Sequence, residues 1–107
     1  MLIVTTNDLP GYTITRVLGE VNGLTVRTRN VGAQIGASLK ALGGGELRGL
    51  TKQLQEARRE ALVRLTEAAE ALGANAVLAM RYDSNELGGT FQEILAYGTA
   101  VQAEARA

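Results

Sequence analysis

The sequence contains neither cysteine nor histidine. Without cysteine no disulfide is possible, which is the usual condition of proteins in a reducing compartment. Without histidine the chain also lacks the side chain that most often serves as general base and as metal ligand near neutral pH. A Ser-His-acid catalytic triad is therefore excluded, and a soft metal ion would find only the thioethers of Met1 and Met80.

Other features are scarce as well. The formal net charge is zero, so no broad electrostatic attraction draws the chain to nucleic acid or to an acidic membrane. No apolar run approaches the roughly 20 residues that span a bilayer, and the N-terminus lacks the basic start and long apolar region of a signal peptide. These absences predict a soluble, cytoplasmic protein without nucleic-acid or membrane partners, and a near-neutral surface that does little to oppose self-association.

The residues that are present suit one domain of 107 residues. With no Trp, one Phe and three Tyr, the core must be built from Leu, Val, Ile and Ala, which favours closely packed helices and sheets. Residues 2–5, 12–18 and 24–28 are predicted as strands, and residues 7–11, which contain Pro10 and Gly11, as a turn. The Asn22-Gly23 pair indicates a tight hairpin or bend between the second and third strands.

The middle of the chain has apolar residues at the spacing of helices. Val31, Ile35, Leu39 and Leu42 predict a short helix that ends at Gly43-Gly44-Gly45. A long helix is predicted over residues 50–72, with Gly73 placed to end it and an i,i+4 ion pair between Glu60 and Arg64. Its expected apolar stripe is Leu50, Leu54, Ala57, Ala61, Leu65, Ala68 and Leu72.

The last third of the chain predicts two strands, residues 76–82 and 91–101, joined by a polar loop over residues 83–90 and followed by a tail from residue 102. Strands that are segregated from helices indicate an α+β fold, in which the long helix covers one face of an antiparallel sheet. The other face and the sheet edges still need cover, and packing against copies of the same chain would supply it.

Several short motifs are spread over nearly the whole chain: Thr5-Thr6, Pro10-Gly11-Tyr12-Thr13-Ile14, Gly19-Glu20-Val21, Gly44-Gly45-Glu46, Thr51, Arg58, Ala61, Ala69, Leu72-Gly73-Ala74-Asn75-Ala76-Val77, Arg81-Tyr82 and Gly98-Thr99-Ala100-Val101. In these residues the chain resembles the YbjQ-like family of small bacterial and archaeal proteins. The resemblance implies a single domain over residues 1–107, a dodecin-like subunit that assembles into a homo-oligomeric ring with a pentamer as the expected form, and a heavy-metal-binding label. It implies no established activity, no catalytic residues and no cofactor.

Two segments are candidate binding sites. The glycine run before the long helix, with Gly44, Gly45 and Glu46, resembles an anion-binding loop, but it lacks the spacing of a dinucleotide fingerprint and the Gly-Lys-Ser/Thr ending of a nucleotide-binding loop. A flexible linker between helices is the favoured interpretation, and the family pattern keeps Gly44, Gly45 and Glu46 as candidates. Residues 83–88 begin like a calcium loop, but Leu87 and Ile94 stand where ligands are needed.

The third candidate is a cluster of Arg81, Asp83 and Glu93 near one end of the last two strands. Asp83 and Glu93 could hold a hard cation or serve as an acid–base pair, while an ion pair with Arg81 is the simpler interpretation. In a ring, such a cluster would recur in every subunit, which makes Arg81 the first choice for a ligand contact. Tyr82 and Tyr97 could stack a flat ligand, although core or interface contacts are favoured.

The leading hypothesis is therefore a non-enzymatic homo-oligomer that binds any small ligand between its subunits. One alternative is a metal- or anion-binding module with oxygen ligands from Glu46, Asp83 or Glu93, because soft heavy metals lack their preferred thiolate and imidazole ligands here. The other is an enzyme with carboxylate acid–base chemistry.

Overall fold

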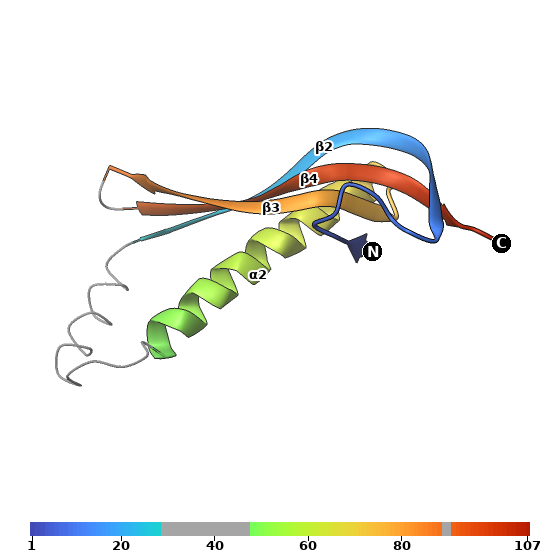
Figure 1. Cartoon of the computed structure of the whole chain (residues 1–107). Coiled ribbons are helices and arrows are strands. Elements are labelled where there is room, and N and C mark those ends of the chain that lie inside the picture. Colours follow the sequence, from blue (N-terminus) through green and yellow to red (C-terminus); the bar gives the residue numbers. More distant parts are fainter. Residues whose placement is uncertain (29–47, 89–90) are drawn as a thin grey trace.

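The computed structural model describes residues 1–28, 48–88 and 91–107. The predicted short helix over residues 31–42 and the glycine run that follows it lie outside the described residues. The fold is α+β, as predicted: a four-stranded sheet carries one long helix (Figure 1). The described elements are β1 (Leu2–Ile3), β2 (Tyr12–Thr28), α2 (Arg48–Ala71), β3 (Ala76–Leu87) and β4 (Phe91–Ala105).

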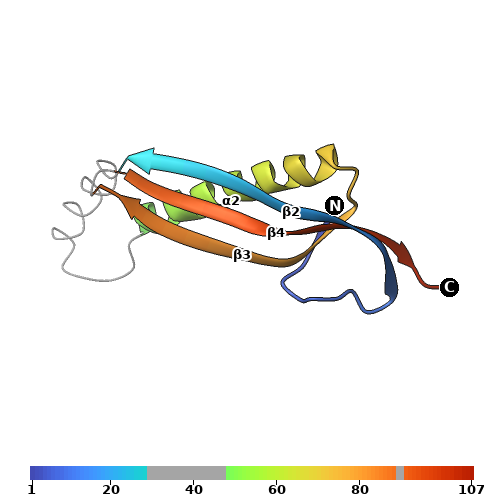
Figure 2. The same ribbon diagram turned by 90° about the horizontal axis from the view of Figure 1, so that it is seen from above.

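The strands lie in the order β1-β3-β4-β2, and Figure 2 shows β4 running between β2 and β3. Both neighbours of β4 are antiparallel to it. At the edge, β1 adds a short parallel pair, in which Leu2 lies opposite Ala76. The sheet is therefore antiparallel as predicted, except at this one edge.

The prediction of a hairpin or bend at Asn22-Gly23 is wrong. β2 is one strand of 17 residues, and it pairs with β4 from Tyr12 opposite Ala105 to Thr28 opposite Phe91. Gly23 serves another purpose, because the helix backbone passes directly over it. A Cβ at this position would overlap the Ala61 carbonyl oxygen and the Leu65 amide nitrogen. Glycine here permits close approach of helix to sheet, not a turn.

The β3–β4 hairpin is also longer than predicted. Residues 83–87, expected in a loop, continue β3, since Asp83 pairs with Leu95 and Leu87 with Phe91. Residues 102–105, expected in a tail, continue β4, and the Arg106 N–H donates to the Gly11 carbonyl at 2.9 Å. The side chains of residues 83–87 are exposed although their backbone groups are paired, which is why their polar composition suggested a loop, whereas Ala103 in the second extension is buried.

The helix packs on the sheet through small side chains. Ala57, Ala61, Leu65 and Ala69 are buried against Val77, Ile94, Ala96 and Ala100 of the sheet. The predicted stripe is confirmed at its centre but not at its ends, where Leu54 is 37% exposed and Leu72 is 48% exposed. Figure 1 shows the reason for Leu54, because α2 diverges from the sheet toward its N-terminal end.

Two predicted glycine positions are confirmed. Gly73 has φ 83° and ends the helix, with its N–H donating to the Glu70 carbonyl at 2.9 Å. The Ala74 N–H donates to the Ala69 carbonyl at 3.0 Å, and the two bonds together form a Schellman motif. In the turn before β2, Gly11 has φ 89° and the Tyr12 N–H donates to the Leu9 carbonyl at 2.9 Å, as a type II turn requires.

The sheet is longer than the elements that cover it. At about 3.3 Å per residue β2 spans roughly 56 Å, whereas α2, at about 1.5 Å per residue, spans roughly 36 Å. On the face away from α2, a second cluster is partly covered by the N-terminal residues Val4 and Leu9. That cluster lies at one end of the sheet, around Ala76, Leu78, Val101 and Ala103. The other half of that face has no such cover among the described residues.

Candidate functional site

The uncovered surface, here called the open face, lies on the hairpin half of the sheet opposite α2. Alternate side chains along a strand point to opposite faces of the sheet, and this alternation shows which residues belong to the open face. The Thr25 hydroxyl donates to the Ala57 carbonyl of the helix at 3.5 Å, and Ile94 and Ala96 are buried under the helix, so the residues between them point the other way. The open face consists of Asn22, Leu24, Val26, Arg81, Asp83, Asn85, Leu87, Phe91, Glu93, Leu95 and Tyr97.

Large apolar side chains dominate this face. Five of them are between 37% and 51% exposed: Leu24, Val26, Leu87, Phe91 and Tyr97. Leu95, between them, is half-buried. Side chains of this size at these exposures present on the order of 400 Å² of apolar surface. This area lies within the range of about 300–600 Å² that is usual for the largest apolar patch on a protein, and such a patch is often functional.

The three predicted strand residues lie on this face. Arg81 pairs across the sheet with Tyr97, Asp83 with Leu95, and Asn85 with Glu93. Asp83 and Glu93 therefore lie diagonally across the β3–β4 pair, in adjacent rows. The structure thus places Arg81, Asp83 and Glu93 on one surface, while Gly44, Gly45 and Glu46 lie outside the described residues.

The contacts of the three differ from a simple ion-pair cluster. Arg81 donates through Nη1 to the carbonyls of Thr5 at 2.8 Å and Met80 at 2.9 Å. The Asp83 carboxylate accepts from the Ser84 N–H at 3.0 Å. Glu93 is half-buried and, within the described part of the chain, has no hydrogen bond or ion pair. Its carboxylate is thus without a partner among the described residues, in a row with Val26 on one side and Asn85 on the other.

The resemblance of residues 83–88 to a calcium loop is not matched by the backbone. These residues form extended strand as far as Leu87, and alternate side chains point to opposite faces. On the far face, the Ser84 hydroxyl accepts from Gln92 Nε2 at 3.0 Å. A strand of this kind cannot wrap its carboxylates around one cation, as a calcium loop does.

Tyr82 and Tyr97 also lie on opposite faces. Tyr82 is half-buried against the helix-side core, and the Arg58 guanidinium carbon lies 5.4 Å from its ring centroid. Tyr97 stands on the open face beside Arg81. The two rings therefore cannot stack on one flat ligand within a single subunit.

A bulge in β3 sets the position of Arg81. Between the pairs Leu78–Thr99 and Arg81–Tyr97, two residues of β3 oppose Gly98 alone. One of them, Ala79, has φ 53°, a conformation that is costly for any residue with a Cβ. Gly98 fits here because a Cβ would lie 2.7 Å from Val77 Cγ1 and 2.9 Å from the Leu78 carbonyl oxygen. In the sequence, Gly98 within a predicted strand was the one signal that could have indicated this bulge.

Asn75 lies next to the helix end, at a turn where Asn often adopts a left-handed backbone conformation. Its backbone φ is not positive. Instead, its side-chain Nδ2 donates to the Ala103 carbonyl at 2.8 Å, and its Oδ1 accepts from the Ala103 N–H at 2.9 Å. The amide thus imitates a strand residue and extends the ladder beside β4.

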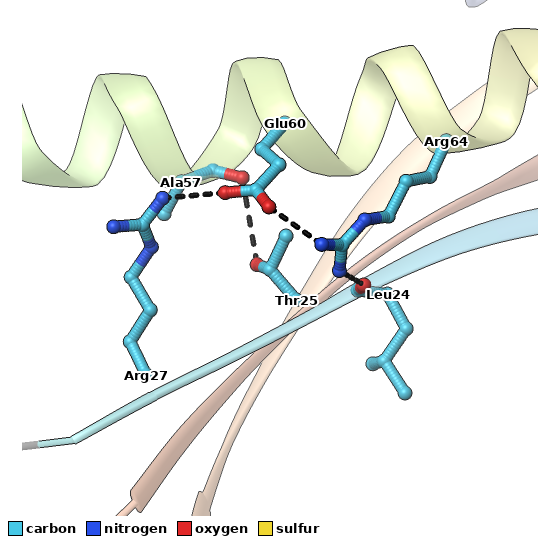
Figure 3. A network of polar contacts seen from close by, with 6 residues as sticks. All are labelled: Leu24, Thr25, Arg27, Ala57, Glu60 and Arg64. Atoms are coloured by element: carbon cyan, nitrogen blue, oxygen red, sulfur yellow. Dashed lines mark hydrogen bonds and ion pairs between the residues drawn. The ribbon is translucent and has the colours of Figure 1, made fainter.

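A polar network joins the helix to the outer strand β2 (Figure 3). Glu60 accepts from Arg27 at 2.6 Å and from Arg64 at 2.6 Å, and Arg64 also donates to the Leu24 carbonyl. The Glu60–Arg64 pair was predicted from its spacing, whereas the tertiary contacts to Arg27 and Leu24 have no sequence signal. The side chains are 43–50% exposed, so each pair contributes little stability.

The family model described as "Putative heavy-metal-binding", that of the YbjQ proteins, matches residues 1–104. The chain belongs to this family. Its relatives include a UPF0145 protein of Streptomyces coelicolor, 62% identical over 94% of this chain and 95% of the relative. Another UPF0145 protein, from Acidothermus cellulolyticus, is 59% identical over 95% of this chain and 94% of the relative. These names state no activity.

A solved structure shares the fold. It is a protein of unknown function of the DUF74 family from Pediococcus pentosaceus, with a TM-score of 0.67 over 97% of this chain and 98% of that chain. The identity is 19%, so this likeness concerns the fold alone.

The heavy-metal description of the family does not fit the donors that this chain offers. With no Cys or His, thiolate and imidazole ligands are absent from the whole sequence. Met80 packs partly buried against the helix-side core. Across residues 1–28, 48–88 and 91–107, no group of three or more Asp, Glu, Cys or His residues could hold one ion. In the same ranges, no helix has the length and hydropathy needed to cross a bilayer.

Proposed function

We propose that the chain acts in the cytoplasm as a non-enzymatic homo-oligomer, a ring for which the pentamer is the expected form. The observation that carries this proposal is the open face. A monomer would leave on the order of 400 Å² of apolar surface in water on that side, and removing such surface from water favours association.

The shape of the subunit supports the same conclusion. Its extents are 58 × 27 × 17 Å and its Cα radius of gyration is 17.4 Å, against about 13 Å for a compact domain of this length. Within the part of the chain that the structure describes, the outer strand β2 has no neighbouring strand on its far side. Copies of the same chain would cover the face, the edge and the exposed helix at once.

Any small ligand would bind between subunits, with Arg81 as its first contact. The two carbonyl bonds of Nη1 hold the guanidinium at the border of the open face. Its remaining N–H groups are then placed to donate to a carboxylate or phosphate. The diagonal placement of Asp83 and Glu93 favours, as the second candidate function, a weak oxygen-ligand site for a hard cation.

Native mass spectrometry of the purified protein tests the assembly. A ring-sized mass supports the proposal, and additional bound mass would reveal a ligand to identify. A monomer at micromolar concentration would refute it. For the second candidate, calorimetric titration with Mg²⁺, Ca²⁺ and Mn²⁺ should give heat that Asp83→Asn and Glu93→Gln each abolish, and no heat would count against it.

A further inference from the structure

The Asn22-Gly23 pair combines a reactive sequence with a protected position. An asparagine side chain that precedes glycine is open to attack by the next backbone nitrogen, because glycine has no Cβ to shield that nitrogen or to restrict the chain. Asn22 is the one asparagine in the sequence that glycine follows. In β2, Asn22 is exposed on the open face, while Gly23 is buried directly under the backbone of α2. A reactive pair thus lies at a tight contact between helix and sheet.

The strand ladder holds the nitrogen of Gly23. The Ala103 N–H and carbonyl both bond to the Asn75 side chain, so they point away from β2. Backbone groups alternate in direction along a strand of an antiparallel pair, and Ala96, an odd number of residues earlier, therefore points toward β2. Gly23 lies opposite Ala96, and its N–H is bound in the ladder. The extended backbone keeps this nitrogen away from the Asn22 side-chain carbon.

We infer that Asn22 is a latent deamidation site, which the fold protects and which unfolding exposes. When β2 leaves the sheet, the freed Gly23 nitrogen attacks the Asn22 side-chain carbonyl carbon. A C–N bond forms, the side-chain amide leaves as ammonia with the proton of the attacking nitrogen, and a cyclic succinimide results. Water then opens the ring at either carbonyl and gives aspartate or isoaspartate. Water is the one co-reactant.

The pair becomes reactive through unfolding of the core, although β2 is an outer strand. Gly23 is buried beneath α2, and Val21 and Thr25 are buried on either side of it. The Thr25 hydroxyl also bonds to the Ala57 carbonyl of the helix at 3.5 Å. Freeing the Gly23 nitrogen therefore requires that the contact between helix and sheet be broken. The reactive fraction of molecules should follow the stability of the whole domain.

The two products differ in their effect on the fold. Aspartate leaves the main chain unchanged and places a charge near Glu20, whose carboxylate accepts from the Asn22 amide at 3.2 Å. Isoaspartate routes the main chain through the side-chain carbon, so the chain gains one backbone atom just before Gly23. This addition moves Gly23 out from under α2, at a contact with Ala61 and Leu65 that admits no Cβ. Isoaspartate should therefore prevent refolding.

Peptide mapping of the intact protein measures the reaction. Trypsin releases residues 17–27 by cleavage after Arg16 and Arg27, and Asn22 is the one asparagine in this peptide. The protein is incubated in mildly alkaline buffer with and without unfolding urea, and a synthetic peptide of residues 17–27 corrects for the effect of urea on the chemistry. The folded protein should deamidate at least about a hundredfold more slowly than the unfolded one. Equal rates, fast or slow, would overturn the inference.

A destabilised variant tests whether unfolding is the route. Asn75→Ala deletes the amide bonds to Ala103 and leaves the Asn22-Gly23 pair unchanged. When opening is fast and reversible, the reaction follows the open population. In buffer without urea, the variant should therefore deamidate at Asn22 faster by the factor by which its unfolding equilibrium constant rises, about five- to thirtyfold. Two different factors would overturn protection by the global fold.

The separated products test the consequence. After incubation in urea, the aspartate and isoaspartate forms are resolved by chromatography and returned to buffer. Asn22→Asp is the control for charge alone, and it should refold with a urea midpoint close to that of the wild type. The isoaspartate form should stay unfolded by circular dichroism, and refolding to the wild-type midpoint would overturn this part of the inference. Neither result depends on copy number, so the native mass tests the proposed ring separately.

Discussion

Gly23→Ala tests how closely the helix lies on the sheet. Gly23 is in the middle of β2, and the backbone of α2 runs across it. A Cβ there would overlap two helix backbone atoms, the Ala61 carbonyl oxygen and the Leu65 amide nitrogen, and lie 3.0 Å from the Arg64 carbonyl carbon. None of these atoms belongs to a flexible side chain. The helix as a whole must therefore move to admit one methyl group.

The cost can be estimated from the core beneath the helix. Moving α2 outward by about 1 Å separates Ala61, Leu65 and their neighbours from the sheet, and a gap of 0.5–1 Å forfeits a quarter to a half of each contact. Overpacking typically costs about 1–3 kcal/mol, and rigid backbone places this site at the upper end. Glycine at position 23 has no positive φ, so alanine brings no backbone strain to add. We expect a loss of about 3 kcal/mol.

Thermal and urea unfolding, followed by circular dichroism at one protein concentration, measure this loss. For a domain of this size, about 3 kcal/mol lowers Tm by roughly 15 °C. Asn22→Ala is the matched control, because Asn22 lies one residue away on the opposite face and loses only a bond to Glu20 at 3.2 Å. It should change stability by less than about 0.5 kcal/mol. Equal midpoints for Gly23→Ala and wild type would refute the close packing.

Two further substitutions test the local backbone. Ala79→Gly should raise the free energy of unfolding by about 0.5–1 kcal/mol, because alanine at φ 53° is strained and glycine relieves more than it costs in the unfolded chain; a lower urea midpoint would contradict the bulge. Asn75→Ala should lower the free energy of unfolding by about 1–2 kcal/mol, because it deletes both amide bonds to Ala103. An unchanged midpoint would show that the amide does not extend the ladder.

The candidate site was predictable only in part. The sequence placed Arg81, Asp83 and Glu93 near one another because two adjacent strands form a hairpin, and they do share one face. It did not show that Arg81 donates to the Thr5 carbonyl, since that contact joins residues 76 positions apart. Nor did it show the row in which Glu93 lies between Val26 and Asn85, because residues 83–87 looked like a loop. The open face could be recognised only from the structure, in which residues 83–87 form part of β3.

Local chemistry in the sequence determined the fold class, the long helix, its end at Gly73, the turn at Pro10-Gly11 and the Glu60–Arg64 pair. Each of these features depends on residues only a few positions apart in the chain. Their spacing or their backbone freedom is enough to produce the feature without a tertiary contact. Tertiary structure alone decided that Asn22-Gly23 is mid-strand, where the helix requires a residue without a Cβ. It also decided which part of the sheet stays open, because α2 packs on one face and the N-terminal residues Val4 and Leu9 cover only one end of the other.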